Sequence, residues 1–292
     1  MTSAGRFAPS PSGELHVGNL RTAILAWLFA RSTGRRFLMR VEDLDRARAG
    51  AEAEQLRDLA AIGITWDGGI VRQTAREHLY TEAIAGLTAA GLTYECFCTR
   101  REIQEAPSAP HAPQGAYPGT CRNLSAADRA AKHAVRPSAV RLRSAVTAGT
   151  VQDVLHGSYT GVVDDFVLRR NDGVTAYNLA VVVDDAAQGV DQVVRGTDLL
   201  SSSPRQAWLT QRLGGTVPEY AHVPLAVNAR GERLAKRDGA VTLADLDLPP
   251  DAVRSLLGSS LRLNACFERV TMAELAARFD PDAVPRTPWV WD

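Results

Sequence analysis

At positions 9–19 the chain reads Pro9-Ser10-Pro11-Ser12-Gly13-Glu14-Leu15-His16-Val17-Gly18-Asn19, and the segments on either side of this stretch decide the fold. Residues 3–9 are short and partly apolar, whereas apolar residues recur at helical spacing between positions 20 and 28. The proline and glycine residues between the two segments break the regular backbone. The stretch therefore predicts a strand, a loop and a helix in succession.

The same alternation continues along the chain. Gly34 closes the first helix, residues 37–42 have the apolar content of a buried strand, and residues 51–62 and 77–90 return to helical periodicity. Later, the apolar run 179–183 and the strand-like residues 191–196 resume the core pattern. A helix then begins at Pro204 and ends at Gly214. This order predicts an α/β fold in which helices cover a parallel sheet.

A span of different composition separates these segments, with proline and alanine clusters at 106–118 and a group of cysteines. We interpret it as an insertion. The predicted organisation is a first half of the α/β domain at 1–94, an insertion at 95–175, a second half at 176–244 and a short C-terminal segment at 245–292. In the C-terminal segment we expect one helical stretch, PPDAVRSLLG, and little else.

Charge and composition exclude several classes of protein. The 292 residues include 33 basic and 33 acidic side chains, so bulk charge cannot hold nucleic acid, and any such contact must be a local patch. No run of 18 apolar residues and no secretion signal occurs, so we expect a soluble cytoplasmic protein without membrane contact. Four cysteines are too few for a disulfide scaffold, and Cys266, which stands apart, is expected in the core.

Two segments have the residue types that bind phosphate. The small residues of 9–19 allow a ligand to reach backbone amides at a helix N-terminus, where His16 can donate to phosphate oxygens. The alternative is a turn with a surface histidine. The second segment, Arg233-Leu234-Ala235-Lys236-Arg237, contains one of only two lysines in the chain. It is either a solvated basic loop or a mobile loop that brings Lys236 to a triphosphate.

Three cysteines lie close together in the sequence, at Cys96, Cys98 and Cys121. Alternate residues of an extended segment point to one side, so the first two can share a metal that a later loop completes. Three thiolates favour a structural zinc ion, for which imidazole is the commoner fourth ligand and His111 is available. The alternative is three small buried residues without a metal.

Taken together, these segments resemble class I aminoacyl-tRNA synthetases. Residues 9–19 are similar to the HIGH signature in the form P-S-P-S/T-G-x-L-H-x-G, which is typical of the glutamyl and glutaminyl branch. Asn19 replaces the second histidine but keeps a donor. Residues 233–237 are similar to the KMSKS loop, with Lys236 at the position of the ATP-binding lysine, whereas Arg233 and Ala235 depart from that pattern.

The resemblance implies a Rossmann-type catalytic domain and assigns roles to individual residues. Binding of L-glutamate is implied for Arg6, Phe7, Ala8, Pro9, Ser10, Glu42, Tyr177 and Arg195. Binding of ATP, with Mg²⁺ held mainly by phosphates and water, is implied for His16, Gly18, Asn19 and Lys236, of which His16, Asn19 and Lys236 act in catalysis. The cysteine pattern of one paralogue of the branch implies that Tyr117 is the fourth zinc ligand, and we prefer it to His111.

That paralogue family is the truncated one, the glutamyl-queuosine tRNA(Asp) synthetases. A glutamyl-tRNA synthetase continues for about 200 residues after its KMSKS loop, but only 55 residues follow Arg237 here, so no anticodon-binding domain is expected. The resemblance implies transfer of glutamate to queuosine in tRNA(Asp) by a monomer, with Arg100, Arg101 and Arg122 near the docking surface. The alternatives are a shortened synthetase that charges tRNA(Glu), a non-catalytic tRNA- or nucleotide-binding module, and another nucleotidyltransferase.

Overall fold

A seven-stranded sheet forms the centre of the computed structural model, which describes residues 3–105, 117–234 and 241–291. Its strand order is β3-β2-β1-β9-β10-β6-β7, and every neighbouring pair is parallel except β6 with β7. The strands are β1 (Ala4–Phe7), β2 (Arg36–Val41), β3 (Val71–Arg72), β6 (Ala148–Asp153), β7 (Gly157–Val162), β9 (Val190–Gly196) and β10 (Glu219–Val223). The predicted α/β fold with a mostly parallel sheet is confirmed.

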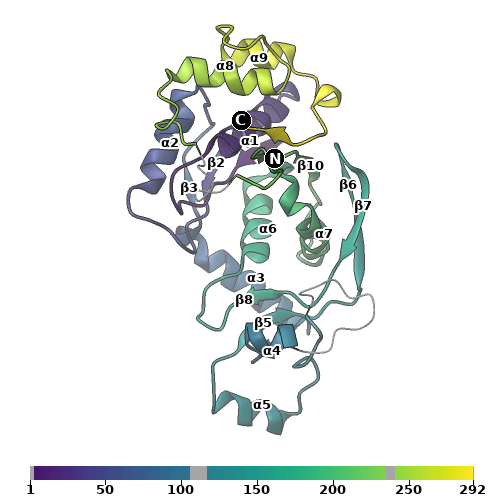
Figure 1. Ribbon diagram of the computed structural model, residues 1–292. Coiled ribbons are helices and arrows are strands. Elements are labelled where there is room, and N and C mark those ends of the chain that lie inside the picture. The colour runs from purple at the N-terminus through teal and green to yellow at the C-terminus, as the bar shows by residue number, and fades with distance from the viewer. Residues whose placement is uncertain (1–2, 106–116, 235–240, 292) are drawn as a thin grey trace.

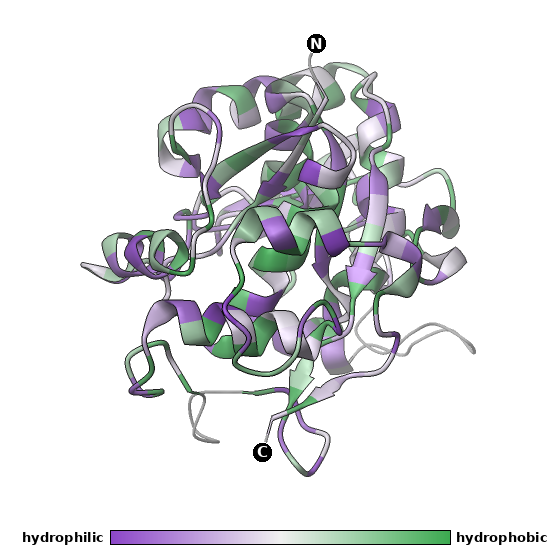
Figure 2. Ribbon diagram, turned by 90° about the horizontal axis from the view of Figure 1, so that it is seen from above, coloured by the Kyte–Doolittle hydropathy of each residue, from purple (hydrophilic) through white to green (hydrophobic). Residues whose placement is uncertain are grey.

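Helices cover both faces of this sheet (Figure 1). They are α1 (Val17–Ser32), α2 (Ala51–Ala61), α6 (Tyr177–Gln188) and α7 (Ser203–Arg212), whereas α3 (Glu77–Ala89) packs on α6. The helices predicted at 51–62 and 77–90 are thus present, and Pro204 lies in the first turn of α7. The apolar run at 179–183 lies in α6. Figure 2 shows hydrophobic and hydrophilic residues alternating along the ribbon, as expected where helices bury one face, whereas α1 is buried over most of its surface.

The span 95–175 divides between two sheets. β4 (Thr93–Cys96), β5 (Ala139–Leu142) and β8 (Val167–Arg169) form a separate three-stranded antiparallel sheet, with α4 (Arg100–Glu105) and α5 (Ala126–His133) beside it at one end of the molecule (Figure 1). The hairpin of β6 and β7 instead joins the edge of the main sheet, where Tyr220 of β10 pairs with Asp153.

The C-terminal segment contains more structure than the single helix that we expected. After β11 (Ala226–Val227) come α8 (Pro250–Ser260), α9 (Met272–Arg278) and β12 (Trp289–Val290), and β12 pairs with β11 in parallel. The expectation of little else was therefore wrong. Cys266 lies in the loop between α8 and α9 and is exposed, so its expected place in the core was also wrong.

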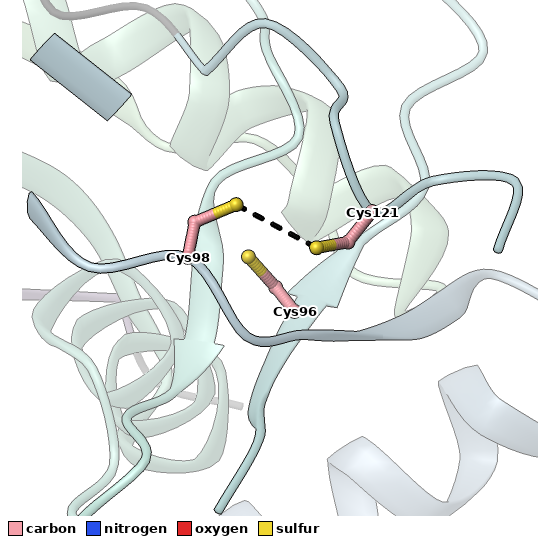
Figure 3. Close-up of side chains that lie close together, drawn as sticks. All are labelled: Cys96, Cys98 and Cys121. Carbon is pink, nitrogen blue, oxygen red and sulfur yellow. Dashed lines mark hydrogen bonds between the residues drawn. The ribbon is translucent and has the colours of Figure 1, made fainter. Parts of the chain in front are cut away.

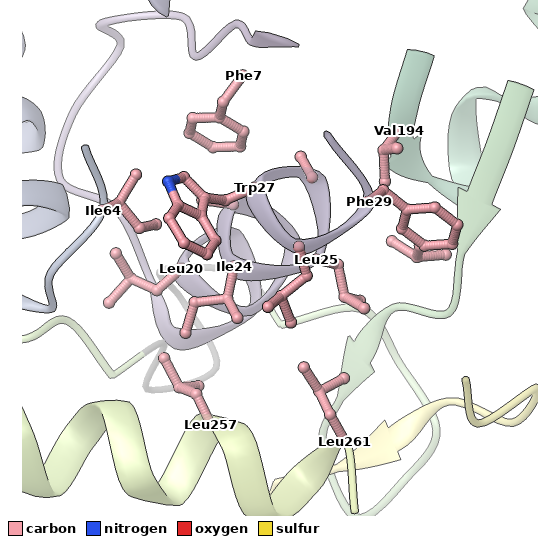
Figure 4. Close-up of a cluster of buried hydrophobic side chains, with 14 of the residues drawn as sticks. Phe7, Leu20, Ile24, Leu25, Trp27, Phe29, Ile64, Val194, Leu257 and Leu261 are labelled. Carbon is pink, nitrogen blue, oxygen red and sulfur yellow. The ribbon is translucent and has the colours of Figure 1, made fainter. Parts of the chain in front are cut away.

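Helix α1 is the reason that the C-terminal segment is ordered. Twelve of its 16 residues are buried, so the helix is covered on almost every side. The sheet covers one face, and the opposite face packs on Leu257, Leu261 and Leu275 of the C-terminal segment, two of which Figure 4 shows below α1. A helix that is apolar all round requires a cover on both faces, and α8 and α9 provide the second one.

Candidate active site

A cavity of about 1340 Å³ opens at the carboxyl ends of the parallel strands β1, β2 and β9. Open α/β sheets bind their ligands at this edge. Every described residue for which glutamate or ATP binding was implied lines the cavity, namely Arg6, Phe7, Ala8, Pro9, Ser10, His16, Gly18, Asn19, Glu42, Tyr177 and Arg195. The sheet topology therefore brings together side chains that are up to 189 positions apart in the chain (195 − 6).

The loop before α1 is held in place by a buried glutamine. Gln55 of α2 donates to the carbonyl oxygens of Ser10 and Gly13 at 3.0 and 2.6 Å, and its side chain is almost fully buried. Through these two hydrogen bonds, α2 holds the loop in place, although α2 is not part of the phosphate-binding stretch. Periodicity alone did not identify Gln55, because a polar residue in an amphipathic helix is expected to be exposed.

His16 and Asn19 cap helix α1. The Nδ1 atom of His16 accepts from the backbone N–H of Gly18 at 3.1 Å, and the Oδ1 atom of Asn19 accepts from the backbone N–H of His16 at 3.1 Å. With its carbonyl used in this way, the amide NH₂ of Asn19 is the part that can donate to a ligand. A Cβ atom at Gly18 would lie 3.0 Å from both the His16 ring and the Ala226 side chain, so the first turn has no room for a larger residue.

Lys236 and Ala235 lie outside the described residues, as does His111. The described residues that follow 235–240 contact the N-terminus of α1. Val17 donates its backbone N–H to the carbonyl of Val241 at 3.0 Å, and His16 forms a β-bridge with Thr242. On the other side, Leu234 is buried and Arg233 pairs with Asp198 at 2.6 Å.

Of the arginines that line the cavity, Arg6 and Arg195 differ in how their charge is balanced. Arg6 forms a salt bridge with Asp185 of α6 at 3.1 Å, and the same carboxylate accepts from the fully buried Arg40 at 2.7 Å. Among the described residues no carboxylate lies within salt-bridge distance of Arg195, whose guanidinium donates to Tyr177 Oη at 3.3 Å and to Ser203 Oγ at 2.8 Å. Arg195 therefore has a positive charge available for an anionic ligand.

Glu42 provides negative charge in the same cavity. Its side chain is 14% exposed and lies 3.4 Å from Arg40. Burial raises the pKa of Glu42, although Arg40 and Arg6 oppose that effect. An ammonium group in the cavity would be a favourable partner for this carboxylate, because pairing offsets the cost of burying a charge.

Behind the cavity, a second carboxylate organises three polar side chains. Asp184 is fully buried and accepts from Gln73 at 2.9 Å and from Tyr80 at 2.8 Å, and it pairs with Arg76. Sequence reasoning missed Asp184 and Asp185. The signal was present, since two adjacent acids follow a run of apolar residues in a helix that packs on the core.

The three cysteines of the predicted metal site meet at one point, beside the cavity (Figure 3). The Sγ atoms of Cys96, Cys98 and Cys121 all lie within 4.8 Å of one another, and those of Cys98 and Cys121 are 3.5 Å apart. A tetrahedral zinc ion with bonds of about 2.3 Å requires sulfur atoms about 3.8 Å apart. The Oη atom of Tyr117 lies 3.3 Å from Cys96 Sγ and 3.6 Å from Cys98 Sγ. This donor set can hold a metal ion.

Electrostatics in this cluster act in opposite directions on two of the cysteines. Burial alone would raise the pKa of the Cys96 thiol, but its hydrogen bond with Tyr117 and the charge of Arg141 outweigh burial and lower that pKa. Burial raises the pKa of the Cys98 thiol to about 11. The guanidinium of Arg141 stacks 3.6 Å from the centre of the Tyr117 ring. Of the arginines that we expected near a docking surface, Arg122 is bound to Asp165 at 2.6 Å and Arg100 lines the cavity.

Comparison with known proteins identifies the class. Residues 4–292 match the catalytic domain of class I tRNA synthetases for E and Q, and the chain belongs to this family. A crystal structure of a glutamate tRNA ligase from Elizabethkingia meningosepticum, in complex with its amino acid, superposes with a TM-score of 0.83 at 25% identity. The match covers 100% of this chain and 67% of the ligase.

Curated relatives define the branch of the family. The chain is 64% identical to the glutamyl-Q tRNA(Asp) synthetase of Nocardia farcinica over 291 residues, which is 98% of this chain and 92% of the relative. It is 50% identical to the protein of the same name from Deinococcus radiodurans over 256 residues, 84% of this chain and 83% of the relative. The chain is thus an enzyme of the aminoacyl-tRNA ligase type.

Among the helices that the structure describes, none has the length and apolar character to cross a membrane.

Proposed function

We propose that the protein activates L-glutamate with ATP to glutamyl-adenylate and then transfers the glutamate to queuosine in tRNA(Asp). The observation that carries the first step is the charge pattern of the cavity, where Arg195 is free of any described carboxylate and Glu42 lies nearby with Arg6. Glutamate has two carboxylates and one ammonium group, which this pattern complements. The acceptor follows from the relatives, which carry the name glutamyl-Q tRNA(Asp) synthetase.

In the first step the α-carboxylate of glutamate attacks the α-phosphorus of ATP and releases pyrophosphate. The N-terminus of α1 offers backbone N–H groups and a partial positive charge to the phosphates, and His16 and Asn19 lie at that end. We propose that Lys236 adds a compact positive charge, because Val241 and Thr242, which follow its segment, contact the same end of α1. Catalysis then rests on positioning and charge stabilisation.

In the second step a hydroxyl of queuosine attacks the mixed anhydride, and AMP leaves.

We propose that Cys96, Cys98, Cys121 and Tyr117 hold one structural zinc ion, which would fix the β4 region against the loop that contains Cys121. ATP brings Mg²⁺ bound by its phosphates and water. We also propose that the protein is a cytoplasmic monomer whose tRNA docking surface includes Arg100, Arg101 and Arg122.

The test measures transfer of labelled glutamate to purified tRNA(Asp) with and without queuosine, next to tRNA(Glu) and a tRNA-free pyrophosphate exchange assay. We expect glutamate-dependent exchange and label only on tRNA(Asp) that contains queuosine. Label on tRNA(Glu) would assign the protein to conventional charging. Absence of exchange would refute activation and favour a binding module.

A further inference from the structure

Arg195 is held from behind by a buried histidine. On the parallel strands β9 and β10, Arg195 and His222 stand opposite each other in register, and the side chains are 5% and 0% exposed. The Nε atom of Arg195 donates to Nε2 of His222 at 3.0 Å, and Ser203 Oγ lies 3.1 Å from the same nitrogen. The orientation of the guanidinium in the cavity therefore depends on His222.

His222 in turn contacts a fully buried carboxylate. Its Nδ1 atom lies 2.6 Å from Oδ2 of Asp153, the last residue of β6. The position of that carboxylate is fixed by three backbone N–H groups, those of Leu155 and His156 to Oδ1 and that of His222 to Oδ2. Asp153 thus links the edge hairpin of the sheet to the cavity through one imidazole ring.

The hydrogen bonds on the two ring nitrogens fix the tautomer. Arg195 can only donate, so Nε2 must accept and the ring proton must be on Nδ1, where it is donated to Asp153. Burial lowers the pKa of His222, which keeps the ring neutral. A proton on Nε2 would place two donors against each other and remove the acceptor that holds Arg195.

We propose that Asp153 and His222 are positioning residues for glutamate, in that Asp153 fixes the Nδ1–H tautomer of His222 and this tautomer aims Arg195 at a substrate carboxylate. Neither residue touches the substrate, since neither lines the cavity. Because the ring is neutral, the charge of Arg195 stays available for the ligand. The inference rests on the proposed activation of glutamate.

The first test is Asp153→Asn. The asparagine amide can keep the oxygen that accepts from Leu155 and His156. Its NH₂ group then replaces the oxygen that accepts from the backbone N–H of His222, and it presents a donor to Nδ1, which drives the ring proton to Nε2. In glutamate-dependent pyrophosphate exchange we expect the KM for glutamate to rise about 10- to 100-fold, because a hydrogen bond to a charged group is lost. The KM for ATP should stay within about twofold of wild type, since a single lost contact to the amino acid leaves the ATP contacts unchanged.

Long-range ¹H–¹⁵N correlation of histidine rings reads the tautomer directly. The protein has six histidines, and the His222 signal is identified by its loss in His222→Gln. We expect the proton on Nδ1 in the wild type and on Nε2 in Asp153→Asn. A wild-type ring with its proton on Nε2, or a charged ring at neutral pH, would overturn the proposal.

Two variants at position 222 test the proposal if Asp153→Asn fails to fold. Glutamine can place an amide oxygen near the position of Nε2 and accept from Arg195, whereas asparagine reaches only the position of Nδ1. We expect His222→Gln to keep the KM for glutamate within about threefold of wild type and His222→Asn to raise it about 10- to 100-fold. Equal KM values in the two variants would show that His222 is only structural.

Two controls separate this proposal from the activity on which it depends. Asp67→Asn removes a carboxylate that accepts from a backbone N–H and from Arg31 outside the cavity, and it should leave the KM for glutamate unchanged. Absence of exchange in the wild type would refute the proposed function, while the tautomer measurement would still decide the arrangement of Asp153 and His222. Exchange in the wild type with an unchanged KM in Asp153→Asn would refute the positioning role alone.

Discussion

Replacement of Asp185 by asparagine tests the buried charge network below the cavity. The carboxylate accepts from Arg6 at 3.1 Å and from Arg40 at 2.7 Å, and the three side chains are between 0% and 11% exposed. Asparagine keeps the size of the side chain but removes the negative charge that both guanidinium groups share. The change therefore leaves two buried cations with less compensation, which is the costly way to break an ion pair.

The expected loss of stability is large. Removal of one partner from a buried ion pair costs about 3–5 kcal/mol. Since about 1 kcal/mol shifts the melting temperature of a large domain by about 2–4 °C, Asp185→Asn should melt about 6–20 °C below wild type. The matched control is Asp67→Asn, whose partner Arg31 is 26% exposed, and there we expect a loss of about 1 kcal/mol or less.

The pH dependence of this loss has a definite sign. Burial opposes ionisation, but Arg6 and Arg40 hold the pKa of Asp185 below its ordinary value. A carboxyl with a lowered folded pKa stabilises the protein above its unfolded pKa of about 3.9 and loses that contribution as the pH falls further. The difference between wild type and Asp185→Asn should thus be complete at pH 7 and shrink below about pH 4. Calorimetry at pH 7 and at pH values below 4 measures the difference in melting temperature. Equal melting temperatures for the two Asp→Asn variants at pH 7 would refute the reasoning.

Three further predictions concern the metal cluster, the cavity and the C-terminal cover. Cys121→Ser should abolish zinc binding measured by elemental analysis, whereas Cys266→Ser, at an exposed cysteine, should retain about one zinc per chain; equal zinc in both would contradict the assigned site. Burial raises the pKa of Glu42, so the KM for glutamate in pyrophosphate exchange should rise as the pH falls. The rise should begin above the ordinary glutamate pKa of about 4.3. A KM that is independent of pH down to about 4.3 would count against an ammonium partner for Glu42. Leu257→Ala, at a fully buried position of α8, should cost about 2–5 kcal/mol in denaturant unfolding, clearly more than Leu256→Ala at a half-buried position; equal losses would show that α8 does not cover α1.

Local patterns predicted the parts of the fold that depend on local physics. The loop and helix around His16 follow from small residues, a cap and an apolar helical repeat, all within about 20 positions. The cysteine cluster was accessible for a similar reason, because the spacing of Cys96 and Cys98 on an extended segment determines their side. The role of the C-terminal segment was missed, although the apolar character of α1 on all faces already required a cover there.

The sequence alone did not predict which residues far apart in the chain become contact partners. Asp153 lies in a span whose composition suggested an insertion, yet its strand joins the main sheet and its carboxylate meets His222 across 69 positions. Gln55 is likewise a polar residue in a helix, and only the packed structure shows that its side chain points inward. Periodicity marks which residues are apolar, but it does not reveal which polar residues find a buried partner.

Arg6 and Arg195 show why those distant partners matter for chemistry. Arg6 shares the carboxylate of Asp185 with Arg40, so its charge is largely balanced before any ligand arrives and it can fix geometry at little electrostatic cost. Arg195 instead rests on a neutral imidazole, a phenol and a hydroxyl, which orient its guanidinium without cancelling its charge. Had Asp153 contacted Arg195 directly, the pair would have been neutral and attraction for an anionic substrate would have been weak. Placing His222 between them keeps the orientation that a carboxylate provides while leaving the positive charge to bind substrate.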